Sequence, residues 1–286
     1  MNTDENLPSY EELSRPLSAV HPKAVYYASI RAAMGSVGRL SDGIRLGYEA
    51  GFDSGVMLEY VYRNQASGRG PLGKLIDRIY LDSPGWKGIR GRGELLKAAV
   101  GRAIDDNHRS GRETRLLDVA CGGGRYVLEA MRERPSTSIH ACLRDYKREN
   151  VEAARELAQG LGVSVRVEPG DAFNDSQLDA LRPRPNTIIV SGLHEILPDN
   201  DLIRTHFTQL ARTLERPGVL IFTVQPHHPQ LELIARVLPS HTGGRWVMRL
   251  RPLEQTLQWA RQAGFDDFHV EMEPSGIFGV CTARLG

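Results

Sequence analysis

Cysteine is scarce in this chain, with three residues in 286: Cys121, Cys142 and Cys281. They are too few and too widely spaced for a disulfide framework or a zinc cluster, so the sequence predicts no metal site. No apolar run reaches the ~18 residues that a membrane-spanning helix needs. The polar, acidic N-terminus lacks the apolar core of a secretory signal. We therefore expect a cytoplasmic protein without a transmembrane segment.

An excess of charge of either sign is also absent, because 36 Lys and Arg residues nearly balance 35 Asp and Glu residues. Without a strongly basic face, a nucleic-acid partner is not expected. The 41% of hydrophobic residues is sufficient for a globular core. These properties favour a small molecule as the partner and leave a homodimer open.

The N-terminal third has helical patterning. Apolar residues recur every three or four positions from His21 to about Asn64, a spacing typical of amphipathic helices. Glycine-rich breaks at 51–55 and 66–71 separate this stretch from a helix expected over 72–80. Another helix is expected over 94–107. The sequence thus predicts a mainly helical N-terminal cap over residues 1–105, which we expect to contribute to substrate binding.

Short β-rich runs begin at Arg115 and alternate with helical segments, a pattern typical of βαβ units and a parallel sheet. The last two runs are joined by only a short turn, which indicates a hairpin. We therefore predict an α/β fold over residues 106–286: a doubly wound, Rossmann-like, mostly parallel sheet with an antiparallel C-terminal hairpin. Strands are expected at 115–120, 138–143, 164–168, 187–191, 219–224, 265–271 and 276–284.

A loop of small residues follows the first of these strands. The strand ends at Asp118, and the run Ala120-Cys121-Gly122-Gly123-Gly124 leads into a helix. Glycine lets the backbone approach a ligand closely and take positive φ angles, and a helix N-terminus offers free N–H groups to an anion. A dinucleotide fingerprint would need a third glycine where Val127 stands. The loop indicates a ligand site, with a plain strand-to-helix turn as the alternative.

Acidic residues follow the next two strands. Asp145 stands where a carboxylate can accept hydrogen bonds from ribose hydroxyls, and Tyr146 and a helix start come directly after it. Asp171-Ala172-Phe173 places an acid and an aromatic ring where an adenine could be bound. Each acid alone is more often a helix cap or a turn residue. All three at the carboxyl ends of parallel strands indicate a ligand site.

This arrangement resembles the class I S-adenosylmethionine (SAM)-dependent methyltransferases over residues 90–286. The resemblance implies SAM as the cofactor, Asp145 as the ribose-binding acid and Asp171-Ala172-Phe173 as the adenine motif. The chain departs from the family pattern at Ala120, where glycine is usual, and at Arg144, where an apolar residue is usual. The cofactor-binding residues expected on this basis are Asp118, Ala120, Cys121, Gly122, Gly124, Asp145, Tyr146, Asp171, Ala172, Phe173, Ser191 and Arg90.

Three further stretches extend the resemblance over nearly the whole chain: 41–44 with 51–55, 85–90 and 225–230. They are similar to a family of uncharacterised bacterial methyltransferases. In some members of that family this module follows an α/β-hydrolase domain, which we do not expect in this chain. The resemblance implies no particular substrate.

Methyl transfer requires a nucleophile aligned with the methyl group and, for some acceptors, a base that removes a proton. His194 and Glu195 follow the fourth strand, where the acceptor should meet the methyl group, and His227 and His228 follow the fifth. These four are the candidate catalytic residues. The structural alternatives are a backbone-bonded histidine and a solvated glutamate. O- and N-methylation of a small, amphipathic or lipid-like acceptor both stay open.

Other functions share this architecture. A SAM-binding protein without transfer activity and a methyltransferase acting on a protein are compatible with the sequence. An NAD(P)-dependent oxidoreductase is a third alternative, against which the missing third glycine counts.

Overall fold

The computed structural model describes residues 7–286, so the first six residues of the predicted N-terminal cap lie outside it. The chain forms two compact units. The helical unit comprises the residues up to Ile89 together with His228–Leu250, and the sheet unit comprises Arg90–His227 together with Arg251–Gly286. The predicted boundary at residue 105 falls within the long helix α6 (Pro84–Arg109), and the predicted division of the chain stays a prediction.

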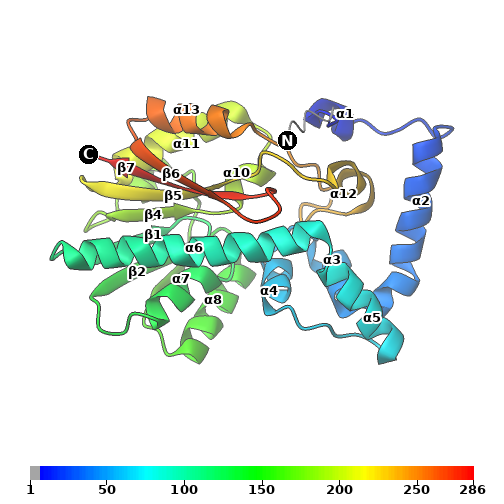
Figure 1. Cartoon of the computed structure of the whole chain (residues 1–286), viewed down its shortest axis with the longest axis horizontal. Helices are drawn as coiled ribbons and strands as arrows, with labels where there is room; N and C mark the ends of the chain where they lie inside the picture. Colours follow the sequence, from blue (N-terminus) through cyan, green and yellow to red (C-terminus); the bar gives the residue numbers. More distant parts are fainter. Residues whose placement is uncertain (1–6) are drawn as a thin grey trace. The chain divides into compact units, whose positions relative to one another are not determined.

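The helical unit consists of short helices, as the apolar periodicity predicts (Figure 1). The buried side chain of Asp77 connects three of them, because its carboxylate accepts hydrogen bonds from the Ser41 and Tyr60 hydroxyls and from the Gly43 and Ser67 N–H groups. A buried carboxylate with four donors is fully satisfied. The elements are α1 (Tyr10–Ser14), α2 (Pro22–Gly35), the 3-10 helix η1 (Val37–Leu40), α3 (Asp42–Ala50), α4 (Gly55–Arg63), α5 (Gly70–Leu81), the first residues of α6, and α12 (Leu231–Val237).

The sheet unit contains a seven-stranded sheet with the order β3-β2-β1-β4-β5-β7-β6. The first five strands are parallel, and β7 runs antiparallel to both β5 and β6. This confirms the predicted fold class, the C-terminal hairpin included. The strands are β1 (Thr114–Asp118), β2 (Ile139–Asp145), β3 (Arg166–Pro169), β4 (Thr187–Val190), β5 (Gly218–Val224), β6 (Asp266–Met272) and β7 (Gly279–Leu285).

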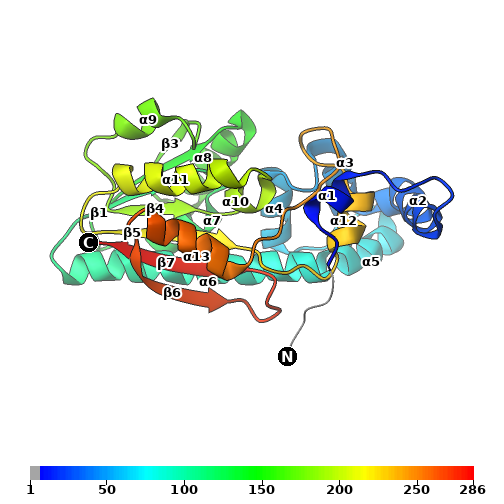
Figure 2. The ribbon, with the colours of Figure 1, turned by 90° about the horizontal axis from the view of Figure 1, so that it is seen from above.

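Helices cover both faces of this sheet (Figures 1 and 2). On one face, α6, α7 (Arg125–Arg132) and α8 (Arg148–Leu161) bury an apolar core that includes Leu96, Leu128 and Val151. On the other, α11 (Asn200–Thr213) and α13 (Leu253–Gln262) bury a core that includes Phe207 and Trp259. Alternating strand residues supply the two cores, since successive side chains point to opposite faces. The short helices α9 (Asp175–Asp179), α10 (Leu193–Ile196) and α12 were not predicted.

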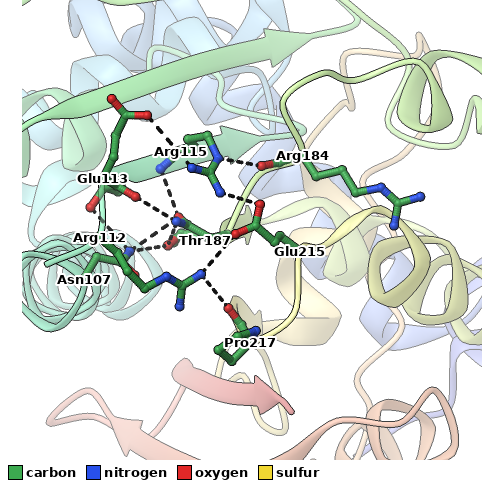
Figure 3. Close-up of polar contacts among 10 residues, drawn as sticks. Asn107, Arg112, Glu113, Arg115, Arg184, Thr187, Glu215 and Pro217 are labelled. Atoms are coloured by element: carbon green, nitrogen blue, oxygen red, sulfur yellow. Dashed lines mark hydrogen bonds and ion pairs between the residues drawn. The ribbon is translucent and has the colours of Figure 1, made fainter. Parts of the chain in front are cut away.

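A polar network joins the amino-terminal ends of β1 and β4 (Figure 3). The Asn107 amide donates to Thr114 Oγ1 and to Thr187 Oγ1, and the Arg115 guanidinium donates to Glu215 and to the Arg184 carbonyl. These contacts stabilise the sheet at its amino end. Ligands of open α/β sheets bind at the opposite, carboxyl end, so the network positions the strands without taking part in the candidate site.

Candidate functional site

The glycine loop after β1 closes against the end of β2. Gly122 and Gly124 have φ angles of 54° and 65°, a left-handed conformation that glycine adopts without strain. Gly124 is the N-cap of α7. The Cys121 N–H donates to the Arg144 carbonyl at 2.8 Å, which fastens the loop to β2. The sequence-predicted loop residues, from Ala120 to Gly124, therefore lie together at the carboxyl end of the sheet and at the start of a helix.

Asp145 holds this loop from the end of β2. Its Oδ2 accepts the Gly122 N–H at 2.9 Å, and its Oδ1 accepts the Lys147 N–H and the Asn150 side-chain amide, also at 2.9 Å. A carboxylate has about four lone-pair sites, so one further hydrogen bond can be accepted at Oδ2. The neighbouring Tyr146 is 82% exposed and its ring is available for contact.

Asp118, the last residue of β1, is completely buried. The Tyr126 hydroxyl donates to its Oδ2 at 2.7 Å, and the Ala120 N–H donates to its Oδ1 at 3.2 Å. Burial raises the pKa of this carboxyl to about 7, because desolvation disfavours the charged form. Asp118 therefore fixes the start of the loop from inside the sheet.

The predicted adenine motif follows β3. Asp171 is exposed and accepts the Phe173 N–H at 2.9 Å, while Ala172 is buried. The half-buried Phe173 ring lies 4.4 Å from the His206 ring, measured between centroids. His206 belongs to α11, so the residues after β3 are in direct contact with the helix that follows β4.

His194 in α10 completes this connection. Its Nε2 lies 2.9 Å from His206 Nδ1, and both rings are buried. Burial lowers the pKa of His206 to about 4 and lowers the pKa of His194 well below its ordinary value, since a desolvated imidazole resists protonation. His194 is therefore a neutral, enclosed imidazole. Phe173, His206 and His194 form one row of rings along the carboxyl end of the sheet.

Glu195 and Ser191 also follow β4. Ser191 is half-buried, and Gly192 donates its N–H to the Thr223 hydroxyl of β5 at 2.9 Å. Glu195 is 7% exposed, and neither of its carboxylate oxygens accepts a hydrogen bond from the residues that the structure describes. A solvated glutamate, the structural alternative considered for this position, is excluded by its burial.

The remaining predicted site residues are His227, His228 and Arg90, and they do not all belong to the same compact unit. His227 is the last residue of its segment of the sheet unit, and His228 is the first residue of the second segment of the helical unit. His228 is buried, its Nδ1 accepts the Gln230 N–H at 3.1 Å, and Gly85 lies beside it. Arg90 is half-buried in α6.

Two residues that contact His194 were not predicted from the sequence. His206 occupies the apolar face of α11, where the helical periodicity predicts a buried residue but does not show which partner it meets. Arg251 was not among the predicted site residues, but it is buried and donates to the His194 carbonyl at 2.8 Å, the Leu197 carbonyl at 2.7 Å and Asn200 Oδ1 at 2.8 Å. Arg251 thus stabilises the segment that carries His194 and Glu195.

Residues 7–286 contain neither a metal-binding cluster nor a membrane-spanning helix. No group of three or more His, Cys, Asp or Glu residues there is arranged to hold a metal ion. No helix in the same range has the length and apolar character needed to cross a membrane.

Comparison of the sequence with known proteins gives two matches. A model of the family described as "putative methyltransferase" matches residues 2–285. The uncharacterized protein YnbC of Escherichia coli (strain K12) is 45% identical over 271 residues, which make up 94% of this chain and 46% of YnbC. The chain thus spans about half the length of the curated relative it matches.

Comparison with solved structures gives the same fold. A possible exported protein from Bordetella parapertussis superposes with a TM-score of 0.65 at 18% identity, over 93% of this chain and 99% of that one. Magnesium protoporphyrin IX methyltransferase from Synechocystis PCC 6803, solved with bound SAH, gives a TM-score of 0.56 at 15% identity, over 91% and 99% of the two chains. At these identities the likeness concerns the fold alone.

Proposed function

Since the chain belongs to the family described as putative methyltransferases, we propose that it transfers the methyl group of SAM to a small-molecule acceptor. The family match bears out the predicted methyltransferase class, and the shared Rossmann-like fold supports SAM as the cofactor. The acceptor, the choice between O- and N-methylation, a cytoplasmic location and the absence of a nucleic-acid partner stay predictions.

One observation carries this proposal: the hydrogen bond between the Gly122 N–H and Asp145 Oδ2. It joins the glycine loop after β1 to the acid after β2, two features that the sequence relates only by spacing. Positive φ angles at Gly122 and Gly124 and the start of α7 make this a tight strand-to-helix turn, which suits the carboxylate and ribose of a nucleoside-like ligand. The residues present therefore fit SAM.

Different residues would bind the cofactor and the acceptor. SAM supplies an electrophilic methyl group on a positively charged sulfur when it is bound. The loop N–H groups and Asp145 would hold its amino-acid and ribose parts, and Asp171-Ala172-Phe173 would bind the adenine. His194 and Glu195, after β4, would face the acceptor, and His227 and His228 are the alternatives after β5. Alignment of the nucleophile is the main requirement of this reaction.

Calorimetry with the purified chain tests the proposal. SAM and S-adenosylhomocysteine (SAH) should bind and raise the melting temperature, because a ligand that binds only the folded state stabilises it by mass action. NAD and NADP should do neither. Nicotinamide binding without SAM binding would instead support the oxidoreductase alternative.

Mass spectrometry then separates an enzyme from a SAM-binding protein. The purified chain is incubated with SAM and a broad panel of small acceptors, and SAH and methylated products are measured. Product formation supports the proposed activity. Tight SAM binding without turnover on any acceptor, including proteins of a cell extract, would favour the non-catalytic alternative.

A further inference from the structure

The Glu195 side chain is buried, and the residues that the structure describes leave it without a hydrogen-bond partner. It lies in α10, directly after β4, and both carboxylate oxygens are without a hydrogen-bond donor among residues 7–286. Burial of a carboxylate without donors is strongly unfavourable. Elsewhere in this chain buried carboxylates are satisfied: Asp77 accepts four hydrogen bonds, and Glu273 accepts bonds from Ser275, Ile277 and Phe278.

The groups packed near Glu195 do not supply the missing donor. The Arg251 guanidinium makes hydrogen bonds to the His194 and Leu197 carbonyls and to Asn200. The Cys281 thiol of β7 is close enough that the Glu195 charge, added to burial as the larger cause, raises the pKa of the thiol to about 12. No hydrogen bond joins the thiol and the carboxylate. Glu195 is therefore enclosed by other residues, but none of those that the structure describes donates a hydrogen bond to its carboxylate.

A second unmatched group lies on the neighbouring strand end. Gln225 follows β5, is 4% exposed, and its side-chain Nε2 has no acceptor among the described residues. The Arg251 N–H contacts the Gln225 carbonyl at 3.5 Å, and the Arg251 guanidinium contacts the His194 carbonyl. Arg251 thus bridges the two segments that carry the unmatched carboxylate and the unmatched amide.

From this arrangement we infer that the acceptor is a small amine with a hydrogen-bonding oxygen near its nitrogen, bound through the nitrogen by Glu195 and through the oxygen by Gln225. The inference rests on the proposed function for the presence of a methyl donor and goes beyond it in naming the acceptor class. The acceptor binds as an ammonium, which donates to the carboxylate in a charge-assisted hydrogen bond. Transfer of that proton to Glu195 then frees the nitrogen lone pair that attacks the methyl group. The acceptor's oxygen receives the Gln225 amide hydrogen. Both side chains are acceptor-binding residues and determine specificity.

A matched ligand panel tests the inference. The probes are small amino alcohols, the amines that lack the hydroxyl, and the diols in which a hydroxyl replaces the amino group. Binding to the SAH-saturated chain is measured by calorimetry. Amino alcohols, which bind as ammonium ions, should bind about tenfold more tightly than the matched diols, because a hydroxyl can donate to the carboxylate but carries no positive charge to pair with it. Equal binding of amines and diols, or no binding by any probe, would overturn the inference.

Variants locate the effect. Glu195→Gln keeps the size of the side chain and removes its charge, so the preference for amino alcohols over diols should disappear. Glu254→Gln, at an exposed glutamate of α13 in the same unit, is the matched control and should keep it. Gln225→Leu should remove the preference for amino alcohols over simple amines. Retention of the nitrogen preference in Glu195→Gln would refute the role of Glu195, and retention of the oxygen preference in Gln225→Leu would refute that of Gln225.

Thermal unfolding without ligand provides a second readout. Because the Glu195 carboxylate has no hydrogen-bond donor among residues 7–286, Glu195→Gln should leave the Tm unchanged or raise it, as is common for functional residues that cost stability. A clear fall in Tm would show that the carboxylate serves the fold, and would overturn the inference. If SAH does not bind, the proposed function is contradicted, but the inference about Glu195 and Gln225 is not. The preference for amines is then measured on the chain without SAH.

Discussion

His194 Nε2 and His206 Nδ1 lie 2.9 Å apart, so one of these two buried nitrogens donates a hydrogen bond and the other accepts it. The bond requires both rings to be neutral, or one of them to be protonated at a high cost in this enclosed position. It also joins the segment after β4 to α11, whose His206 contacts Phe173 after β3. The predicted acceptor and adenine regions are thereby coupled through one pair of side chains.

The first prediction concerns acid sensitivity. The pKa of His206 is lowered to about 4 and that of His194 is lowered well below its ordinary value, whereas an unfolded histidine titrates near pH 6.5. As the pH falls below about 6.5 the unfolded chain therefore binds protons first, and folding stability is lost until the pH reaches about 4. His206 alone should contribute roughly 3 kcal/mol over this window.

A variant isolates this contribution. His206→Asn can still bond to His194 but does not titrate, so its free energy of unfolding should depend less on pH between 7 and 4.5 than that of the wild type. Asp118, whose pKa is raised to about 7, stabilises the fold as the pH falls. Its contribution is the same in the wild type and in His206→Asn, so it cancels from the comparison. Urea titrations at each pH measure the difference. His108→Asn, at an exposed histidine, is the control; a change in slope as large as that of His206→Asn would contradict the assignment.

The second prediction concerns the glycine loop. A Cβ on Gly124 would lie 2.7 Å from Leu143 Cδ1, a fully buried side chain, and the φ angle is 65°. Gly124→Ala should cost about 1–2 kcal/mol for the left-handed backbone and about 1–3 kcal/mol more for overpacking. Gly111→Ala has a φ of 68° with no atom within 4 Å of the new methyl group, so it should show only the backbone cost. If urea titrations show the same loss in the free energy of unfolding for Gly124→Ala and Gly111→Ala, the contact with Leu143 adds no cost.

Much of the fold was predictable from local patterns. The alternation of β-rich runs and helices after Arg115 gave each strand to within a few residues, because buried parallel strands need apolar runs and their crossovers need helices. The loop at 120–124 and Asp145 were predicted to share one edge, and Gly122 and Asp145 are in fact hydrogen-bonded.

What the sequence did not show are partnerships between distant residues. His206 lies 12 residues after His194, and helical periodicity predicts its burial but not the ring it meets. The burial of Arg251 was not predicted, since the pattern of arginines in the sequence does not reveal that its side chain donates to the carbonyls of residues 194 and 197. Similarly, that Glu195 is buried without a partner depends on the packing of α10, a helix of four residues that is too short to have a periodicity.

The third prediction concerns Asp145. Asp145→Ala removes one ligand hydrogen bond and also the three that the carboxylate accepts from Gly122, Lys147 and Asn150. SAM affinity should fall by about 1.5–3 kcal/mol, and the Tm should fall as well because the loop is released. Asp145→Asn keeps one acceptor oxygen, so its SAM affinity and Tm should lie between those of the wild type and of Asp145→Ala. Calorimetry with SAM measures both, and an unchanged dissociation constant in Asp145→Ala would assign the ribose contact to another residue.

The last prediction concerns turnover at His194. The ring is buried, its Nε2 is bonded to His206, and its Nδ1 has no partner among residues 7–286. In the neutral tautomer whose Nε2 donates to His206, Nδ1 can accept a proton from an acceptor hydroxyl as the new bond forms. For a hydroxyl acceptor, His194→Ala should therefore lower turnover by about 10²–10⁴-fold, the usual contribution of a positioned base, while SAM affinity stays within about twofold.

An amine acceptor gives a different expectation, because a neutral nitrogen attacks with its own lone pair and alignment suffices. His194→Ala should then reduce turnover by less than about tenfold, an effect of looser packing around His206. The pH dependence of turnover separates the two cases: loss of a base removes the acidic limb of the profile, whereas loose packing lowers the whole profile and also the Tm. His227→Ala and His228→Ala are measured alongside. If either of them abolishes the acidic limb while His194→Ala leaves it intact, the base follows β5, and His194 only positions the segment after β4.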